Sequence, residues 1–225
     1  MAKKKSSAGK QTRVLVVDDH PIVRQGMIRL INEAPDLAVV AEGGSAEEAL
    51  QAIAEHKPDI AIIDLFLKDS SGLDLIKDIK THHPETYILV LSMHDASVYA
   101  ERVLRAGARG YIMKDEGAAK VLEGIRHVLA GEIYLGEETS QKILSRLAGQ
   151  SLSSEEAQIN SLTDREIEIL DLLGRGLGTQ EIAAKLHRSA KTVETHRENI
   201  KAKLNMASSR DLLQYAIEWS KSKRI

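Results

Sequence analysis

The sequence predicts an α/β protein: a doubly wound, five-stranded parallel sheet followed by a second, small all-α domain with a helix-turn-helix. Short apolar runs alternate with helical-period segments in the front part of the 225-residue chain. The runs are apolar throughout, which is typical of strands buried on both faces of a parallel sheet. In the back part the helical period continues without strands. The length is sufficient for two such domains.

The predicted elements of the front part alternate along the chain. Its strands are "RVLVV" (13–17), "LAVVA" (37–41), "DIAIID" (59–64), "TYILVLS" (86–92) and "GYIM" (110–113). Helical-period segments lie near 21–34, 45–56, 72–82, 96–106 and 117–130. "SAEE" (45–48) has the pattern of a capping box at the start of the second of these helices. The first domain is therefore expected to span residues 13–131.

The segments on either side of this domain differ from it. Residues 1–12 contain lysines but no apolar run, so we expect a disordered tail and no secretory signal. Residues 132–160 are expected to form a linker, with a helix over "EETSQKILSRLAG" and a polar, mobile stretch over "QSLSSEEAQINS". The second domain, 161–225, contains helical-period segments at 164–174, 179–186, 190–205 and 208–220, the first opened by the capping box "TDRE".

Composition and charge exclude several classes of protein. The chain has no Cys, so disulfides, thiolate metal sites and a cysteine nucleophile are excluded, and a cytoplasmic location is expected. No apolar run approaches the roughly 20 residues of a membrane-spanning helix. Residues 11–160 carry 15 Lys/Arg and 24 Asp/Glu (15 − 24 = −9), whereas 161–225 carry 12 and 9 (12 − 9 = +3). The two parts are therefore expected to have different partners.

Polar residues stand at the ends of four predicted strands. Asp18 and Asp19 follow the first strand in "VLVVDDH", Asp64 ends the third, Ser92 ends the fourth and Lys114 follows the fifth. The carboxyl ends of parallel strands meet at one edge of the sheet, where ligands bind at the switch point in strand order. Three carboxylates at this edge repel one another and need a cation. A hard divalent ion, most naturally Mg²⁺, fits these oxygen ligands.

Each of these residues has a simpler interpretation when taken alone. An acidic pair at a strand end is more often a solvated turn, Asp64 alone suits a helix cap, and Lys114 alone suits a surface lysine. Their occurrence together, in order, at the strand ends favours a site. Four histidines suggest a transition-metal site, but we expect them to be exposed loop residues: His20, His82, His83 and His94.

Residues 13–131 resemble the receiver domain of bacterial response regulators, which has a flavodoxin-like fold. The resemblance rests on "VVDDH", "DLFLKDSSG", "LSMHD" and "GYIMKD", which occur in the expected order. It implies that Asp64 is the phosphoacceptor. It also implies that Mg²⁺ is bound by Asp64, by Asp19 directly, by Asp18 mainly through water, and by the backbone carbonyl of Phe66.

The same resemblance assigns the remaining polar residues to the phosphoryl group. Ser92 would donate a hydrogen bond to it, Lys114 would pair with it, and Tyr111 would be an aromatic switch that turns inward. Phosphoryl transfer needs mainly alignment and charge neutralisation, and the product would bias a two-state surface. Lys68 and Asp115 stand where many receivers have proline, which leaves the loop geometry and the lifetime of the phosphate open.

The segment "TQEIAAKLHRSAKTVETHRENIKAKL" (179–204) predicts a helix-turn-helix. The polar face of its second helix is long enough for the major groove of DNA. A solvated helix face would give the same pattern. That face carries Lys191, Glu194, Thr195 and Glu198, and the apolar stripes of the two helices consist of Ile182, Ala183 and Leu186, then Val193, Ile200 and Leu204.

Residues 162–217 resemble the LuxR-type helix-turn-helix, and with the receiver in front the whole chain resembles a NarL/FixJ-type response regulator. "LTDREIEILDLL", "TQEIAAKL" and "KTVETHRENIKAKL" carry this resemblance. It implies a transcription regulator that is not a turnover enzyme. A sensor histidine kinase would phosphorylate it, and it would bind double-stranded promoter DNA and form a homodimer on phosphorylation or on DNA through its last helix. No membrane partner is expected.

The LuxR-type resemblance also implies a set of DNA contacts. Residues expected near phosphates are Arg188, Lys191, Thr192 and Lys201, and those expected near bases are Glu194, Thr195 and Glu198. A glutamate in the major groove can accept a hydrogen bond from the amino group of cytosine, and we expect this of Glu194, with a supporting role for Glu198. The alternative is that the two glutamates hold Arg197 and Lys201, each three residues further on.

Two other functions are considered. A haloacid-dehalogenase-like phosphohydrolase needs a second Asp two residues after its nucleophile, and Phe66 at that position cannot move a proton. A LuxR regulator that senses a small molecule needs a ligand pocket. The aromatic content of 3% speaks against it, and it leaves the strand-end residues unexplained. Phosphatase turnover and ligand-induced melting shifts would distinguish these functions.

Overall fold

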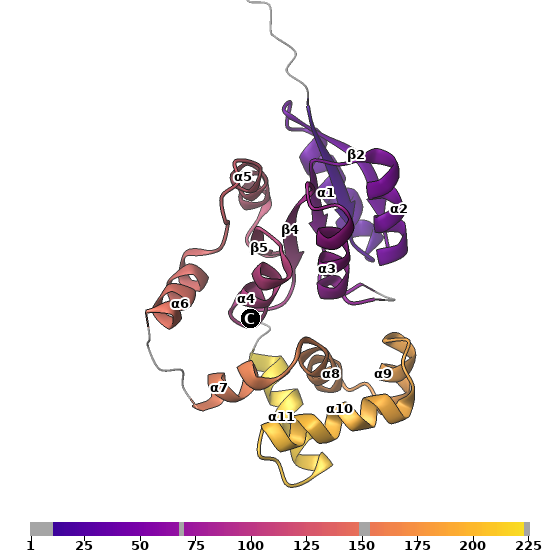
Figure 1. Cartoon of the computed structure of the whole chain (residues 1–225), viewed down its shortest axis with the longest axis vertical. Coiled ribbons are helices and arrows are strands. Elements are labelled where there is room, and N and C mark those ends of the chain that lie inside the picture. Colours follow the sequence, from indigo (N-terminus) through magenta and orange to yellow (C-terminus); the bar gives the residue numbers. More distant parts are fainter. Residues whose placement is uncertain (1–10, 68–69, 149–153, 223–225) are drawn as a thin grey trace, which may run out of the picture.

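The structure, a computed structural model, describes residues 11–67, 70–148 and 154–222 (Figure 1). The predicted disordered tail lies mostly outside the described residues, but its last residue, Thr12, begins the first strand and is therefore ordered. Lys68 also lies outside them. So does the beginning of the linker stretch predicted to be mobile.

Five parallel strands form one sheet in the order β2-β1-β3-β4-β5. This confirms the predicted doubly wound, all-parallel sheet. The order reverses between β1 and β3, where Val17 lies opposite Ile63 and ligands bind in folds of this kind. The strands are β1 (Thr12–Val17), β2 (Leu37–Gly43), β3 (Ile60–Ile63), β4 (Tyr87–Ser92) and β5 (Gly110–Met113).

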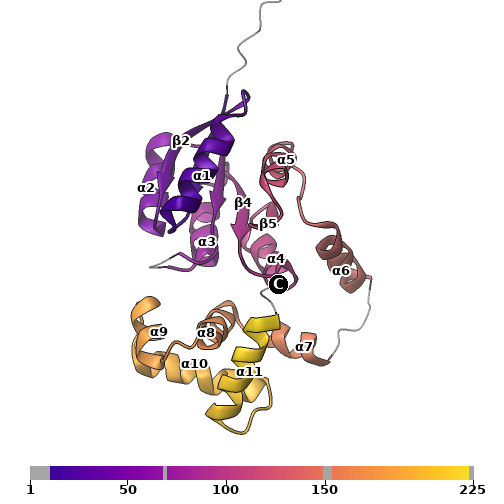
Figure 2. The ribbon, with the colours of Figure 1, turned by 180° about the vertical axis from the view of Figure 1, so that it is seen from behind.

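Helices cover both faces of the sheet, as the views in Figures 1 and 2 show. Successive residues of a strand point to opposite faces. Val14 and Val16 accordingly belong to the apolar cluster that includes α1 and α5 residues. Leu15 and Val17 belong to the cluster on the other face. The helices are α1 (Pro21–Asn32) and α5 (Ala118–Leu129) on the first face, and α2 (Ala46–His56), α3 (Gly72–His82) and α4 (Ala96–Ala106) on the second.

Six helices follow the sheet domain in the described residues, and the first two of them begin within the predicted linker. The helix predicted over "EETSQKILSRLAG" forms as α6, whereas the prediction of a mobile polar stretch is wrong for the described residues 154–161. They form α7, because Ile159 on this helix is buried in the apolar core. The elements are α6 (Glu137–Leu147), α7 (Ser154–Ser161), α8 (Asp164–Gly174), α9 (Thr179–Lys185), α10 (Ala190–Lys203) and α11 (Ser209–Ser222).

One of the two predicted capping boxes is complete. Thr163 accepts a hydrogen bond from the Glu166 backbone, and the Glu166 side chain accepts one from the Thr163 backbone. At the start of α2, Ser45 accepts from the backbone of Glu48, but the Glu48 carboxylate accepts from the backbone of Gly44 instead. Both arrangements satisfy N–H groups that have no partner within the helix.

The two domains contact each other through α3 and α4 on one side and the start of α8 on the other. The carboxylate of Asp164 pairs with Lys77 at 2.8 Å and with Arg102 at 2.9 Å. Arg165 pairs with Asp74 at 3.0 Å. In Figure 1, α8 lies between the sheet domain and α10. Ion pairs at the start of α8 therefore connect the helical domain to the receiver-like domain.

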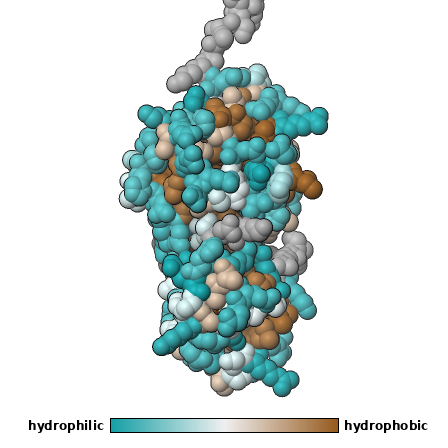
Figure 3. All heavy atoms as spheres, turned by 90° about the vertical axis from the view of Figure 1, so that its right-hand side faces the viewer, coloured by the Kyte–Doolittle hydropathy of each residue, from teal (hydrophilic) through white to brown (hydrophobic). Residues whose placement is uncertain are grey.

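Apolar packing accompanies these ion pairs. Tyr99 and Val103 of α4 belong to the same continuous cluster of buried side chains as Ile159, Leu162 and Ile167 of the helical part. On the face shown in Figure 3, hydrophilic residues cover most of both domains. None of the helices in the described ranges is both long enough and apolar enough to span a membrane.

The interface also contains a buried carboxyl group with an altered pKa. Glu168 of α8 is 8% exposed and accepts a hydrogen bond from Arg165 at 2.6 Å. Burial raises the pKa of Glu168 to about 7, with nearby Asp74 adding to the effect and Arg165 and Lys185 opposing it. The folded protein therefore binds this proton more tightly than the unfolded chain, so stability falls as pH rises from the ordinary pKa of Glu to about 7.

We predict that Glu168→Gln stabilises the protein at pH 8, because it removes the cost of a buried charge. The gain should be about 1–3 kcal/mol at pH 8 and much smaller at pH 5. Thermal unfolding at the two pH values measures the difference, with the exposed Glu218→Gln as the matched control. An equal effect at both pH values would contradict the assignment of this group.

Candidate functional site

Three carboxylates meet where β1 and β3 end side by side. Asp18 and Asp19 follow β1, and Asp64 follows β3. The backbone N–H of Asp64 donates to the Val17 carbonyl at 2.9 Å, which continues the sheet pairing into the site. Asp18 is 4% and Asp64 5% exposed, so both carboxylates have lost most of their contact with water. The sequence prediction that these three residues share one edge of the sheet agrees with this geometry.

Lys114 lies between two of these carboxylates. Its Nζ is 2.6 Å from Oδ2 of Asp18 and 2.7 Å from Oδ2 of Asp64. The strand pairing places it there, since the N–H of Lys114 donates to the carbonyl of Ser92 at 2.8 Å. The sequence predicted that Lys114 would converge with the acidic residues, and the structure brings it into direct contact with two of them.

Burial and charge act in opposite directions on this pair. Burial raises the pKa of Asp64 above its usual range, although the ammonium group of Lys114 partly opposes the shift. For Lys114, burial lowers the pKa, but the carboxylates of Asp64 and Asp18 outweigh it and the net pKa is raised. Lys114 therefore stays charged, and one ammonium group does not fully compensate the carboxylates around it.

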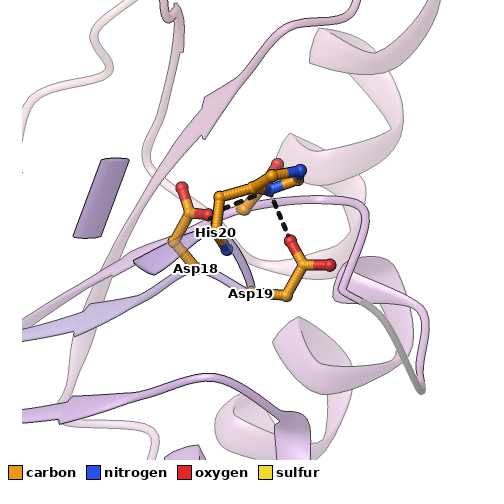
Figure 4. A group of neighbouring side chains, drawn as sticks. Asp18, Asp19 and His20 are labelled. Carbon is orange, nitrogen blue, oxygen red and sulfur yellow. Dashed lines mark hydrogen bonds and ion pairs between the residues drawn. The ribbon is translucent and has the colours of Figure 1, made fainter. Parts of the chain in front are cut away.

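The acidic residues form a compact set of potential metal ligands together with His20. One ligand atom from each of Asp18, Asp19, His20 and Asp64 lies within 4.8 Å of the others. Nδ1 of His20 is 2.7 Å from Oδ1 of Asp19 and 3.3 Å from Oδ1 of Asp18 (Figure 4). The side chain of His20 is 66% exposed, as expected of a loop histidine, yet it borders the cluster. This proximity of His20 to the carboxylates was not predicted from the sequence.

The hydrogen bonds of the cluster suggest which carboxylates are available to a cation. Asp18 accepts from the backbone of His20 at 2.8 Å and from Lys114, so both of its oxygens have partners. The buried Oδ1 of Asp19 accepts no well-oriented hydrogen bond, and its near neighbour is the exposed imidazole of His20 at 2.7 Å. Carboxylate oxygens are the ligands that hard divalent cations prefer. The residues therefore fit such a cation, with Asp19 the most available ligand.

The switch residues expected from the sequence lie beside this cluster. Ser92 is fully buried and its Oγ accepts from the N–H of His94 at 3.3 Å. Tyr111 is 1% exposed, and its hydroxyl donates to the carbonyl of His94 at 2.6 Å. Burial raises the pKa of Tyr111, so the phenol remains a donor. The aromatic ring that was expected to turn inward therefore already lies inside in this structure.

His94 contradicts the expectation of an exposed loop histidine. Its side chain is only 13% exposed because the helical domain docks against it. Nε2 is 2.6 Å from Nη2 of Arg175, and Nδ1 is 3.5 Å from Oδ1 of Asp171. The imidazole also lies against the ring of Phe66, with centroids 3.9 Å apart. These contacts were not predicted from the sequence, because the partners of His94 come from the other domain.

A cavity of about 680 Å³ opens next to Asp64. The receiver-like domain supplies most of its wall, but Arg175 and Lys185 come from the helical domain. These two residues were not expected at the site from the sequence, since only the docking of the domains brings them there. The side chain of Phe66 was also not expected to line the cavity. Phe66 is the only Phe of the chain, and this rarity could have drawn attention to it. The wall includes Asp19, Asp64, Phe66, Lys114, Arg175 and Lys185.

The second candidate site is the polar face of α10. The apolar stripes predicted for the helix-turn-helix are buried, which confirms the predicted packing of these helices. The side chains predicted to contact DNA lie on α10 or in the turn before it, and all are partly or fully exposed: Arg188, Lys191, Thr192, Glu194, Thr195, Glu198 and Lys201. The face is thus accessible in the docked arrangement, and Arg188 borders a cavity that Asp74 and Asp78 also line.

Both glutamates of this face are engaged in side-chain pairs. Glu194 Oε1 accepts from Thr179 Oγ1 and from Arg197 Nη1, the latter at 3.0 Å. Glu198 pairs with Lys201 at 2.9 Å. These are the pairs that the alternative to base reading required. The contact with Thr179 additionally joins the first residue of α9 to α10.

Comparison with known families identifies both domains. Residues 14–126 match the response regulator receiver domain, and residues 160–216 match the luxR family of bacterial regulatory proteins. The oxygen regulatory protein NreC of Staphylococcus epidermidis is 36% identical over 211 residues, which cover 92% of this chain and 97% of NreC. NreC of Staphylococcus aureus is 37% identical over 210 residues, with the same shares covered.

Solved structures with both domains are also similar. The RcsB response regulator of Salmonella typhimurium has a TM-score of 0.72 and 25% identity, covering 93% of this chain and 98% of RcsB. RcsB bound to a promoter in the presence of the phosphomimetic BeF₃⁻ has a TM-score of 0.69 and 27% identity, covering 92% and 98%. The chain belongs to the NarL/FixJ-type response regulators, with a receiver domain and a LuxR-type helix-turn-helix domain. It is therefore a transcription regulator rather than a turnover enzyme.

We predict that Asp64→Asn stabilises the folded protein when divalent cations are removed. The raised pKa of Asp64 means that its ionised form opposes folding, and a neutral amide removes this cost. The melting temperature at pH 7.5 should rise by about 2–4 °C.

The difference should shrink as the pH falls toward the ordinary pKa of Asp, where the folded protein takes up this proton before the unfolded chain does. Asp115→Asn is the control, because Asp115 borders the same cavity but is exposed. A lower melting temperature for Asp64→Asn than for wild type would refute the argument.

Proposed function

We propose that Asp64 accepts a phosphoryl group from a sensor histidine kinase and that this modification controls promoter binding by the helix-turn-helix domain. The observation that carries the proposal is the pairing of Asp64 with Lys114 beside a second buried carboxylate, at the switch point of the sheet and next to an open cavity. A protein that carries these groups on its receiver domain and a reading helix on its second domain can link phosphorylation to transcription.

The residues of the site have separate tasks in the transfer. Oδ of Asp64 forms a bond to phosphorus while the bond between phosphorus and the donor histidine nitrogen breaks, and the nitrogen keeps the electron pair. Lys114 neutralises a phosphoryl oxygen, and the hydroxyl of Ser92 donates to another. Asp19, Asp64, the Phe66 carbonyl and, through water, Asp18 would hold Mg²⁺. When bound, Mg²⁺ supplies charge neutralisation at the phosphoryl oxygens.

The helix-turn-helix domain is proposed to bind promoter DNA as a homodimer. Arg188, Lys191, Thr192 and Lys201 would contact phosphates, and Thr195 would face the bases. The net charge of +3 for residues 161–225 is modest, and phosphate contacts supply much of the affinity for DNA. Two copies double these contacts. RcsB has been solved as dimers on DNA, which supports the same assembly here. Such a regulator would work in the cytoplasm.

We predict that acetyl phosphate with Mg²⁺ adds one phosphoryl group to the wild-type protein and none to Asp64→Asn. Intact mass spectrometry measures the added group directly. Asp19→Ala should shift the reaction to a Mg²⁺ concentration about tenfold higher, because it removes a direct ligand. Exposed Asp115→Asn is the control and should label like wild type. Labelling of Asp64→Asn to the wild-type level would remove Asp64 from its role.

We further propose that Glu194 acts as a positioning residue for Arg197 and Thr179, which replaces the expectation that it reads a base. Glu194→Ala should then weaken DNA binding about threefold to tenfold for all sequences, with the sequence preference kept, since losing such hydrogen bonds costs about 1 kcal/mol. Binding-site selection at two salt concentrations measures both quantities.

Glu198→Ala is the matched control for Glu194→Ala. It removes the same charge from the same helix face, but it leaves the link between α9 and α10 intact. If Glu194→Ala relaxes the preference at a single base position of each half-site while the affinity for other sequences is kept, Glu194 reads a base and the positioning role is wrong.

A further inference from the structure

The cavity beside Asp64 has a wall that belongs to the DNA-binding domain. Arg175, directly after α8, and Lys185, the last residue of α9, line it together with Asp64 and Lys114. We propose that Arg175 and Lys185 are anion-binding residues of the phosphorylation site, so that docking of the DNA-binding domain and occupation of the site by a phosphoryl group favour each other. This inference rests on the proposed role of Asp64.

Contacts from both domains hold Arg175 at the cavity. Within its own domain, Nε is 2.7 Å from Oδ2 of Asp171. Across the interface, Nη2 donates to Nε2 of His94 at 2.6 Å, and the guanidinium carbon lies 5.3 Å from the centroid of the Phe66 ring. The side chain is 28% exposed, so it is held at the border of the cavity while keeping access to it. Such a preorganised guanidinium suits phosphoryl oxygens, which it can bind through two N–H groups.

The charge balance around Asp64 indicates what Arg175 and Lys185 can do there. Asp18, Asp19 and Asp64 carry three negative charges, and Lys114 together with a bound divalent cation would balance them. A phosphoryl group on Asp64 then adds negative charge and new acceptor oxygens. Lys185 and Arg175, the latter already paired with Asp171 at 2.7 Å, are further cations that line the cavity, which the exposed carboxylate of Asp115 also borders. The cavity is open to solvent, so their attraction for the added charge is that of partly exposed ion pairs.

The position of Tyr111 agrees with this coupling. The resemblance to receiver domains implies that the aromatic ring turns inward when the site is phosphorylated. In the docked structure Tyr111 is already inside, and its hydroxyl donates to the carbonyl of His94. The side chain of the same His94 binds Arg175. His94 therefore contacts both the docked domain, through its imidazole, and the inward Tyr111, through its carbonyl.

A coupling of this kind is reciprocal. If the docked domain strengthens anion binding at Asp64, then an anion at Asp64 strengthens docking by the same factor. The opposite scheme, in which the phosphoryl group displaces the DNA-binding domain, predicts the opposite sign in both measurements. The two schemes are thus distinguishable in the full-length protein.

The first experiment measures phosphorylation by acetyl phosphate in full-length protein with Mg²⁺. The acyl O–P bond breaks, Asp64 takes the phosphoryl group and acetate leaves. Arg175→Gln and Lys185→Gln should each raise the acetyl phosphate concentration that gives half-maximal rate by about threefold to tenfold, with Arg175→Lys in between. Arg210→Gln, an exposed position in the same domain, should match wild type. Lys185→Gln leaves the contact with His94 intact and so tests the charge independently of docking.

The second experiment measures docking itself. The chain has no Cys, so Ala54→Cys and Ala202→Cys, both exposed and in different domains, place two spin labels without side reactions. Pulsed dipolar spectroscopy then gives the distribution of distances between the domains. BeF₃⁻ with Mg²⁺ should increase the docked population of otherwise wild-type protein, and Arg175→Gln should abolish this increase.

Three results would contradict the proposal. Equal or faster phosphorylation of both Arg175→Gln and Lys185→Gln at low acetyl phosphate would show that neither residue binds the anion. A fall in the docked population on addition of BeF₃⁻ would show that the site and the interface compete. Failure of the wild type to label at Asp64 would instead overturn the proposed function and the inference with it, and the wild-type measurement alone reveals that case.

Discussion

The contact of Lys114 with Asp18 and Asp64 is the interaction on which the rest of the site depends. It brings together residues from the ends of β1, β3 and β5, which the parallel pairing of these strands places at one edge of the sheet. Because burial still raises the pKa of Asp64, the cluster remains short of positive charge. That shortage makes this edge of the sheet a favourable place for a cation.

The DNA-binding domain is attached to the same edge of the receiver domain. Asp164 pairs with Lys77 and Arg102 at one end of the interface, and Arg175 binds His94 beside the cavity at the other. A continuous apolar cluster lies beneath these polar contacts. The polar face of α10 remains accessible, so the docked arrangement places Arg175 and Lys185 at the cavity beside Asp64 without covering that face.

Most of the fold was predictable because its signals are local. Uninterrupted apolar runs separated by helical periods predicted the five strands and their helices, and α3, α4 and β5 have the bounds that the periodicity indicated. The capping pattern at Thr163 likewise predicted the start of α8. The prediction of a mobile linker was wrong at α7, since the burial of Ile159 depends on a partner surface far away in the sequence. Similarly, the sequence around His94 is typical of an exposed loop, and the side chain loses most of its exposure only because another domain covers it.

The sequence by itself determined the class of fold, the convergence of Asp18, Asp19, Asp64, Ser92 and Lys114, and the polar face of α10. These follow from strand ends and helical periodicity, which depend on neighbouring residues in the chain. Only the tertiary structure decided which atoms pair within the acidic cluster, that Tyr111 lies inward, and that Arg175 and Lys185 line the cavity. These features depend on how two separately folded surfaces fit together, and the apolar and charged contacts that govern this fit join residues with no periodic relation in the sequence.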